Sequence, residues 1–342
     1  MSMVSRWNTS LLHLPGHSDV FQGCGWRQND GLSERITEDD DVIFGEYPWV
    51  VAIFKYVAKT NSYEYCCVGS LIHHKVVLTV KHHFKKPARV RVRAGDWDIV
   101  EDYEIYNHQT SDVANIIGHP KYKPRNPSTS SVATKGLGGA VPRGPQAQGA
   151  LESLPENLNR TQLLKISPIF KINMTGTNEY DAALLILATS INLAPNVAFA
   201  CLPSASHATP SGTRCHVTGW GYDTFYNGSI QNILKRVEVP VVGNAICQQQ
   251  ISTALSKSIT LSDSMMCAGG EKGKDACLKD GGAPLVCPYE DQRERYYQAG
   301  IVSWGVRCGL PNVSGVYTSV AMVRDWIDST MIELKYESTY LP

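Results

Sequence analysis

The stretch Asp275-Ala-Cys-Leu-Lys-Asp-Gly-Gly-Ala-Pro-Leu-Val-Cys287 is a glycine-containing loop between two cysteines. Between Cys277 and Cys287 it contains no serine, no threonine and no further cysteine. Acyl-transfer chemistry needs a hydroxyl or thiol beside a general base. The loop therefore offers no nucleophile in any register. Taken alone it would be an ordinary glycine-rich turn, so its meaning depends on the rest of the chain.

The bulk composition describes a globular chain without a charge bias. With 342 residues the chain can form one large or two medium domains. Lys plus Arg and Asp plus Glu number 32 each, which gives no electrostatic reason to expect nucleic-acid or membrane partners. No segment approaches the roughly 20 apolar residues of a membrane span.

The ten cysteines indicate an oxidising compartment and so an extracellular, secreted protein. They do not show the paired Cys-x-x-Cys spacing of zinc sites. Residues 1–21 lack the apolar core of a secretory signal. We therefore expect a fragment of a longer precursor or a gene model that begins late. Five glycosylation sequons agree with secretion, at Asn8, Asn159, Asn173, Asn227 and Asn312.

The loop at 275–287 resembles the nucleophile loop of chymotrypsin-like serine proteases, where Gly-Asp-Ser-Gly-Gly-Pro lies between two cysteines. Further motifs follow in that family's order: Gly45-Glu-Tyr-Pro-Trp49, Cys67-Val-Gly-Ser-Leu-Ile72, Asn178-Glu-Tyr-Asp-Ala-Ala-Leu-Leu-Ile-Leu187, Cys215-His-Val-Thr-Gly-Trp-Gly221 and Gly300-Ile-Val-Ser-Trp-Gly305. The resemblance implies an all-β fold, a trypsin-like double antiparallel β-barrel with a C-terminal helix.

The resemblance also divides the chain. It implies a serine-protease-like domain over residues 36–330, with barrels at about 36–200 and 201–330, between a cysteine-tethered lead segment, 1–35, and a tail, 331–342. Residues 124–177 interrupt it with the composition of a disordered segment. We expect an inserted surface loop there, or a gene-model error. Apolar residues at helical spacing predict a helix over 319–334.

By motif, the family's general base falls on His82, its orienting aspartate on Asp181 and its serine on Gly281. Loss of the nucleophile alone costs on the order of 10⁶ in turnover. Lys279 replaces a glycine whose N–H helps bind the oxyanion, and Lys81 adds a cation beside His82. These positions are therefore expected to be remnants, and the chain is predicted not to be an enzyme.

The sequence at the start of the domain also indicates that the chain is not an active enzyme. Active relatives begin with Ile-Val-Gly-Gly, and the freed amino terminus pairs with the aspartate that corresponds to Asp280. This chain has Arg35-Ile-Thr-Glu38 at that place. We therefore do not expect the usual activation step.

Asp275 falls at the base of the primary specificity pocket, where an aspartate selects Lys and Arg side chains. The resemblance places the pocket walls at Ser303, Trp304, Gly305 and Gly315. Two interpretations stay open. The pocket could still accept a basic side chain, or it could be a closed relic.

The resemblance implies four disulfides: Cys24–Cys201, Cys215–Cys287, Cys247–Cys267 and Cys277–Cys308. His83 replaces the family partner of Cys67, and Cys66 lies outside the pattern. We expect both to be partly buried free thiols, with a vicinal disulfide or an intermolecular bridge as alternatives.

No metal or other cofactor is predicted. A His82-His83 metal pair is disfavoured, because adjacent residues on an extended segment point to opposite faces. Calcium stays open as a minor alternative, because some relatives bind it in the corresponding loop and oxygen ligands suit it. The acidic residues of that loop are Asp96, Asp98, Glu101, Asp102 and Glu104.

Within the superfamily, the chain is most similar to arthropod clip-domain serine protease homologues, including prophenoloxidase-activating factors. The similarity is carried by Cys267-Ala-Gly-Gly-Glu-Lys-Gly-Lys-Asp275, Ala94-Gly-Asp-Trp-Asp98 and Tyr296-Tyr-Gln-Ala-Gly-Ile-Val302, beside the loop itself. It implies a secreted, non-catalytic cofactor or adaptor in prophenoloxidase activation and melanisation, part of innate immunity. The implied partners are clip-domain serine proteases and prophenoloxidase, or another secreted protein. Family members carry a six-cysteine clip domain, of which this chain shows only Cys24.

Two alternatives remain. One is a trypsin-like endopeptidase with residual activity, which would need a nucleophile that the loop does not supply. The other is a defective gene product, because the insertion and the missing partner of Cys67 could prevent stable folding.

Overall fold

The computed structural model describes residues 23–28, 31–32, 40–85, 88–101, 104–124, 126–127, 174–175, 178–225 and 228–341. The chain divides into two units, Met1–Lys123 with Asn178–Pro342, and Pro124–Thr177. In the second unit, β6 (Asn126–Pro127) pairs antiparallel with β7 (Met174–Thr175). This unit has the bounds of the expected insertion, most of which lies outside the described residues.

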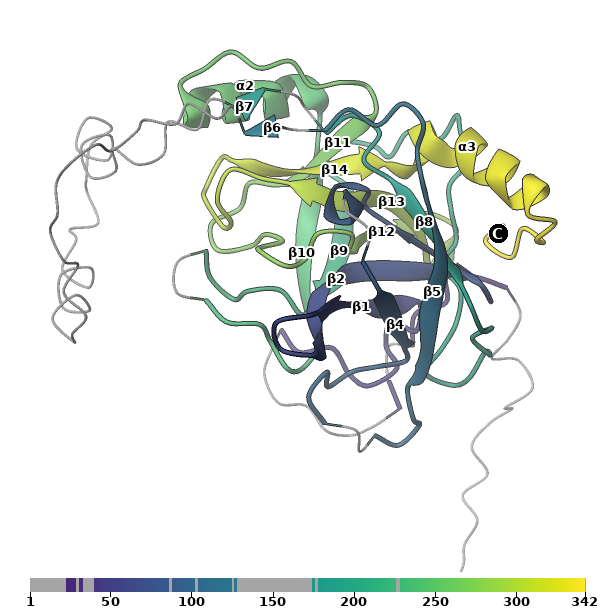
Figure 1. Cartoon of the computed structure of the whole chain (residues 1–342). Helices are drawn as coiled ribbons and strands as arrows, with labels where there is room; N and C mark the ends of the chain where they lie inside the picture. The colour runs from purple at the N-terminus through teal and green to yellow at the C-terminus, as the bar shows by residue number, and fades with distance from the viewer. Residues whose placement is uncertain are drawn as a thin grey trace, which may run out of the picture. The chain divides into compact units, whose positions relative to one another are not determined.

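The first unit contains two closed six-stranded antiparallel barrels (Figure 1). The first has the strand order β1-β2-β3-β8-β5-β4. Its Val- and Ile-rich strands suit a pleated, half-buried surface. They are β1 (Val50–Val57), β2 (Ser62–His73), β3 (Val76–Thr79), β4 (Val90–Ala94), β5 (Gln109–Gly118) and β8 (Ala183–Leu187).

The second barrel has the order β10-β11-β14-β13-β12-β9. Its strands are β9 (Arg214–Gly219), β10 (Lys235–Val242), β11 (Met265–Gly269), β12 (Pro284–Tyr289), β13 (Gln292–Trp304) and β14 (Ser314–Ser319). Strands β2 and β12 make contacts between the barrels. The cleft described below lies where loops from both barrels meet. The predicted all-β, double-barrel fold is confirmed.

Two α-helices accompany the barrels, α2 (Asn244–Leu255) and α3 (Val320–Glu333). Helix α3 matches the helix predicted over 319–334, because its capping residues are Ser319 and Leu334. Its buried face includes Val323, Ile327 and Met331, and the helix contacts β13 and β14. The helix continues past residue 330, so the tail begins only after Glu333.

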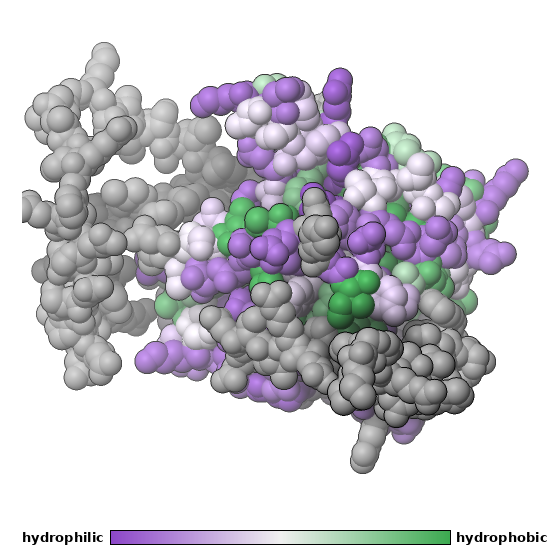
Figure 2. All heavy atoms as spheres, turned by 90° about the horizontal axis from the view of Figure 1, so that it is seen from below, coloured by the Kyte–Doolittle hydropathy of each residue, from purple (hydrophilic) through white to green (hydrophobic). Residues whose placement is uncertain are grey.

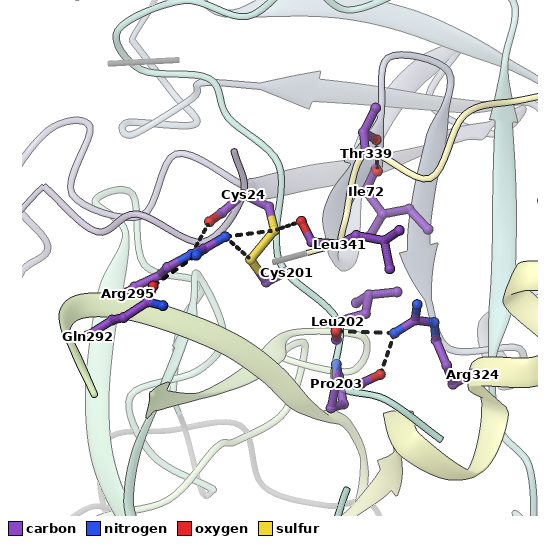
Figure 3. Close-up of a disulfide and its surroundings, with 10 residues drawn as sticks. All are labelled: Cys24, Ile72, Cys201, Leu202, Pro203, Gln292, Arg295, Arg324, Thr339 and Leu341. Carbon is purple, nitrogen blue, oxygen red and sulfur yellow. Dashed lines mark hydrogen bonds between the residues drawn. A yellow bond between two sulfur atoms is a disulfide. The ribbon is translucent and has the colours of Figure 1, made fainter. Parts of the chain in front are cut away.

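The four disulfides of the first unit are Cys24–Cys201, Cys215–Cys287, Cys247–Cys267 and Cys277–Cys308. They are the pairs that the resemblance implies. Figure 3 shows the first of them, Cys24–Cys201. Arg295 lies beside it, and its Nε donates a hydrogen bond to the Cys24 carbonyl at 3.1 Å. A disulfide typically contributes about 2–4 kcal/mol to the free energy of unfolding.

The carboxy-terminal tail folds back beside this tether. Tyr340 is fully buried, and its carbonyl accepts a hydrogen bond from the Leu202 N–H at 3.0 Å. The Thr339 hydroxyl donates to the Ile72 carbonyl at 2.5 Å, as Figure 3 shows. The tail is therefore part of the folded unit and links β2 to the start of the second barrel.

On the face that Figure 2 shows, hydrophobic residues form small clusters among hydrophilic ones. Among the described residues, no helix has the length and apolarity that crossing a membrane requires.

Candidate functional site

His82 and Asp181 meet in the cleft between the barrels. The short 3₁₀ helix His82–Phe84 follows β3, while Asp181 precedes β8 and is completely buried. His82 Nδ1 lies 2.6 Å from Asp181 Oδ2, and the His82 backbone N–H donates to Asp181 Oδ1 at 2.8 Å. The hydroxyl of Ser303 in β13 donates to Asp181 Oδ2 at 2.7 Å. Residues of both barrels therefore fix the carboxylate, and the carboxylate orients the imidazole.

Gly281 faces the same cleft, but the space beside it is filled. A Cβ atom at position 281 would lie 2.4 Å from His83 Nε2. This nitrogen is buried and has no hydrogen-bond partner among the described residues. The imidazole of His83 therefore occupies the volume into which a side chain at position 281 would extend. The sequence showed that His83 stands where the family has the cysteine partner of Cys67, but it gave no signal that the His83 ring turns toward residue 281.

The two adjacent histidines lie on one side of the chain, and the geometric argument used against a His82-His83 metal pair is wrong. They belong to a 3₁₀ helix and not to an extended segment. Their ring centroids are 4.1 Å apart, with an interplanar angle of 47°. In a helical turn, neighbouring side chains need not alternate between opposite faces.

Burial and nearby cations keep His83 neutral. Burial lowers its pKa well below the ordinary value, and electrostatic interactions with the neighbouring imidazole of His82 and with the ammonium groups of Lys55, Lys279 and Lys85 lower it further. Lys55 lies beside it, with Nζ donating to the His83 carbonyl. Lys81, in contrast, extends its side chain toward β5, where a Cβ at Gly118 would lie 2.6 Å from Lys81 Cδ.

Asp280 is held by backbone donors. Its two carboxylate oxygens accept from the Gly221 and Cys277 N–H groups, each at 2.9 Å. Burial raises the pKa of Asp280 to about 6. Glycine is required at position 221, because a Cβ there would lie 2.3 Å from the Asp280 carboxyl carbon. Residues 33–39, the region of the expected activation start, lie outside the described residues.

Lys279 has a left-handed backbone with φ of +77°. For a residue with a Cβ this conformation costs roughly 1–2 kcal/mol. The lysine also ties the loop to β2: its Nζ donates to the Tyr65 carbonyl at 3.3 Å, and the Tyr65 hydroxyl donates to the Lys279 carbonyl at 3.3 Å. The turn therefore keeps the backbone region that suits glycine, although it carries a lysine.

A pocket of about 200 Å³ extends from His82 and Gly281 to Asp275. All four predicted wall residues line it: Ser303, Trp304, Gly305 and Gly315. Val302, from the Gly300–Gly305 motif, also lines it, as do Phe225 and Arg307, to which the family motifs had not pointed. A larger cavity of about 560 Å³ lies elsewhere, against Arg27, His216 and Arg236.

The carboxylate of Asp275 is partly unsatisfied. Oδ2 accepts from the Gly309 N–H at 3.3 Å, whereas Oδ1 is buried without a partner among the described residues. Burial raises the pKa of Asp275 to about 7. A Cβ at Gly315 would lie 3.0 Å from Oδ1, so glycine keeps the space beside this oxygen open. A cationic group that enters the pocket would find an acceptor there.

The acidic loop brings Asp96, Glu104 and His108 together, with ligand atoms within 4.8 Å of one another. Asp96 Oδ1 and Glu104 Oε2 are buried without hydrogen-bond partners among the described residues. Calcium takes about six to eight oxygen ligands, and these two oxygens would supply only part of such a set. Asp98 has another role, because its Oδ1 accepts from the Val100 and Glu101 N–H groups.

Comparison with known proteins agrees with this geometry. The trypsin family model matches residues 36–135 and 142–327. The chain is 38% identical to phenoloxidase-activating factor 2 of Galleria mellonella over 337 residues, which cover 95% of this chain and 94% of that protein. It is 30% identical to inactive CLIP domain-containing serine protease A28 of Anopheles gambiae, covering 91% of this chain and 68% of that protein.

A second Anopheles gambiae protein, inactive CLIP domain-containing serine protease A8, is 31% identical, with coverage of 91% and 72%. The match to the family model spans both barrels and every residue of the cleft described above. The chain therefore belongs to the trypsin family, and its relatives include a phenoloxidase-activating factor and inactive clip-domain serine proteases.

Proposed function

We propose that this chain is a secreted, non-catalytic member of the trypsin family that acts as a binding cofactor in an extracellular clip-domain protease cascade. The observation that carries the proposal is the state of position 281. Glycine at this position supplies no nucleophile, and a Cβ atom added to Gly281 would lie 2.4 Å from His83 Nε2. His82 and Asp181 have the arrangement of a general base and its orienting group, but the glycine at position 281 places no hydroxyl beside His82.

Binding is supported at the other end of the pocket. Asp275 Oδ1 has no partner among the described residues, and its surroundings are left open by Gly315. A guanidinium or ammonium group would satisfy this oxygen by a charge-assisted hydrogen bond. The cleft would thus hold a Lys or Arg side chain of a partner protein without cutting the chain beside it.

The cascade is inferred from the relatives. One is named a phenoloxidase-activating factor, and two are named inactive clip-domain proteases. Four disulfides in the folded unit agree with an extracellular location. We infer that clip-domain proteases and prophenoloxidase, or another secreted protein, are the partners, and that the cascade is the one that leads to melanisation.

A reconstitution tests this proposal. Prophenoloxidase and a clip-domain protease are mixed with and without this protein, and phenoloxidase activity and peptide-bond cleavage are measured. The expected result is higher phenoloxidase activity with the protein present, and no cleavage of prophenoloxidase by this protein alone. Cleavage by the purified protein alone, or no effect on activity, would contradict the proposal.

A residual endopeptidase is the second candidate, because the His82–Asp181–Ser303 hydrogen bonds are intact. Such an enzyme would need a nucleophile outside the 277–287 loop. A fluorophosphonate probe, which labels an activated serine, separates the two candidates. We expect no covalent label, and a labelled peptide would favour the endopeptidase.

A further inference from the structure

Cys66 and Cys67 are adjacent, buried thiols that the proposed function does not use. Both are free, and their residues are 8% and 0% exposed. The other eight cysteines form the four disulfides. In an otherwise fully paired protein, two unpaired neighbours on one strand need a physical explanation.

The backbone of β2 is irregular at these residues. Tyr65 pairs with Phe54 and Cys67 pairs with Ile53, so Cys66 has no partner on β1. It is the extra residue of a β-bulge, which interrupts the alternation of side chains along a strand. The bulge explains how two consecutive residues can both be buried on a strand whose neighbours would ordinarily face opposite sides.

Two ammonium groups lie around Cys66. Lys279 Nζ donates to the Tyr65 carbonyl at 3.3 Å, at the peptide bond that leads into Cys66. Lys55, on the neighbouring strand β1, interacts with the Cys66 thiol and donates to the His83 carbonyl. Positive charge beside a thiol favours the thiolate, which is the reactive form.

The two thiols differ in ionisation. The interaction with Cys67, aided by Lys55 and Lys279, lowers the pKa of Cys66 to about 7 despite its burial. Burial, together with the Cys66 thiol, raises the pKa of Cys67 well above its ordinary value. At neutral pH a substantial fraction of Cys66 is therefore thiolate, while Cys67 stays protonated. One is suited to attack an oxidant, and the other can then resolve the product.

Metal binding is less favoured by the surroundings. Within the described part of the chain, the group of ligand side chains that lie close enough to share a metal ion consists of Asp96, Glu104 and His108. Neither cysteine belongs to this group. The cations at Lys55 and Lys279 would also oppose a metal ion. The environment suits an oxidant better than a cation.

We propose that Cys66 and Cys67 form a peroxide-oxidisable dithiol, with Cys66 as the attacking thiol and Cys67 as the resolving thiol. The Cys66 thiolate attacks hydrogen peroxide and breaks its O–O bond, which gives a Cys66 sulfenic acid and hydroxide, released as water. The Cys67 sulfur then attacks the Cys66 sulfur, and the sulfenic oxygen leaves as water with the Cys67 proton. The dithiol loses two electrons and two protons, and the peroxide is reduced to two waters.

The product is a reversible disulfide. Consecutive Cα atoms are about 3.8 Å apart, which is shorter than the usual span of about 4.4–6.8 Å across a disulfide. A bond forced into this span is easily reduced. The next residue, Val68, donates its N–H to the Gly281 carbonyl at 3.1 Å, so the dithiol is directly connected to the cleft loop.

Peptide mass spectrometry of the full-length protein tests the proposal after treatment with hydrogen peroxide and alkylation of remaining thiols. The peptide that contains both cysteines is expected to lose two hydrogen atoms, and dithiothreitol is expected to reverse the change. In Cys67→Ser, Cys66 is expected to gain one oxygen, trapped by dimedone. In Cys66→Ser, Cys67 is expected to stay unmodified. An unchanged wild-type peptide, or a dimer linked through these residues, would overturn the proposal.

A second comparison leaves the sulfur atoms in place, so that it does not depend on the folding of the serine variants. Lys279→Gln removes a cation beside Cys66, whereas Lys272→Gln removes an exposed cation from the separate Glu271–Lys274 turn, earlier in the same connection between β11 and β12. The rate of disulfide formation is expected to fall several-fold in the first variant and to stay at the wild-type value in the second. Equal rates in both would refute the role given to the cluster.

Discussion

The two barrels contribute different features to the two sides of the cleft. On the second-barrel side, Asp275 lies in an open pocket beside the Cys277–Cys308 disulfide, with glycine at position 315. On the first-barrel side, Cys67 is a free thiol and His83 turns its ring toward Gly281. The walls around Asp275 come from the second barrel, whereas His82 and His83 of the first barrel line the pocket beside Gly281. One side can therefore change while the other keeps its geometry.

The largest expected effect comes from giving Cys67 a partner. In His83→Cys, a disulfide to Cys67 would close a loop of roughly 15 residues, worth about 3 kcal/mol of unfolding free energy. Urea unfolding with and without reductant measures it, and His83→Ser is the matched control because it also removes the imidazole. If both variants unfold at the same urea concentration under oxidising conditions, Cys67 is not placed to pair with position 83.

Removing the charge at the base of the pocket should have the next largest effect. Benzamidine, a planar amidinium, is expected to bind the wild-type protein through Asp275. In Asp275→Asn the affinity should fall at least about thirtyfold, about 2 kcal/mol, because the cation loses its ionic partner. Isothermal titration calorimetry measures the change. Equal affinity for both proteins would mean that the pocket is closed or that the ligand binds elsewhere.

The same ligand should show a defined pH dependence. Burial raises the pKa of Asp275 to about 7. The amidinium binds the ionised carboxylate, so a protonated Asp275 must release its proton first. Affinity should fall about tenfold per pH unit below 7 and level off above it. In Asp275→Asn the profile should be flat across this range. A wild-type profile as flat as that of the variant would contradict the assignment.

The smallest expected effect concerns the strained turn. Lys279 has φ of +77°, a region that glycine adopts without steric cost. Lys279→Gly should be more stable than Lys279→Ala by about 1 kcal/mol, since both lose the hydrogen bond from Lys279 Nζ to the Tyr65 carbonyl but only alanine keeps the strain. Thermal unfolding compares them. Equal stability would show that the loop relaxes at this position.

The sequence predicted the fold because the family motifs surround elements with strong local patterns. The strand after Asp181 and the helix over 320–333 have apolar spacing that can be read directly. The cysteine pairs and pocket walls followed from motif order. In contrast, the direction of the His83 ring depends on packing between two barrels, and the bulge at Cys66 depends on pairing with β1. Neither has a local sequence signal. The alternation rule failed for His82 and His83 because they lie on a 3₁₀ helix and not on a strand.

The most direct test of the claim that His83 fills the space beside residue 281 is hydrolysis of an arginine amide substrate by the wild-type protein and by Gly281→Ser. Each protein is first shown to bind benzamidine, which confirms an intact pocket. We predict no turnover above buffer for either protein, because the wild type has no hydroxyl or thiol between Cys277 and Cys287 and the new serine would meet His83 Nε2. Turnover by the wild type would contradict the non-catalytic function. Turnover by Gly281→Ser alone would show that His83 does not block the site.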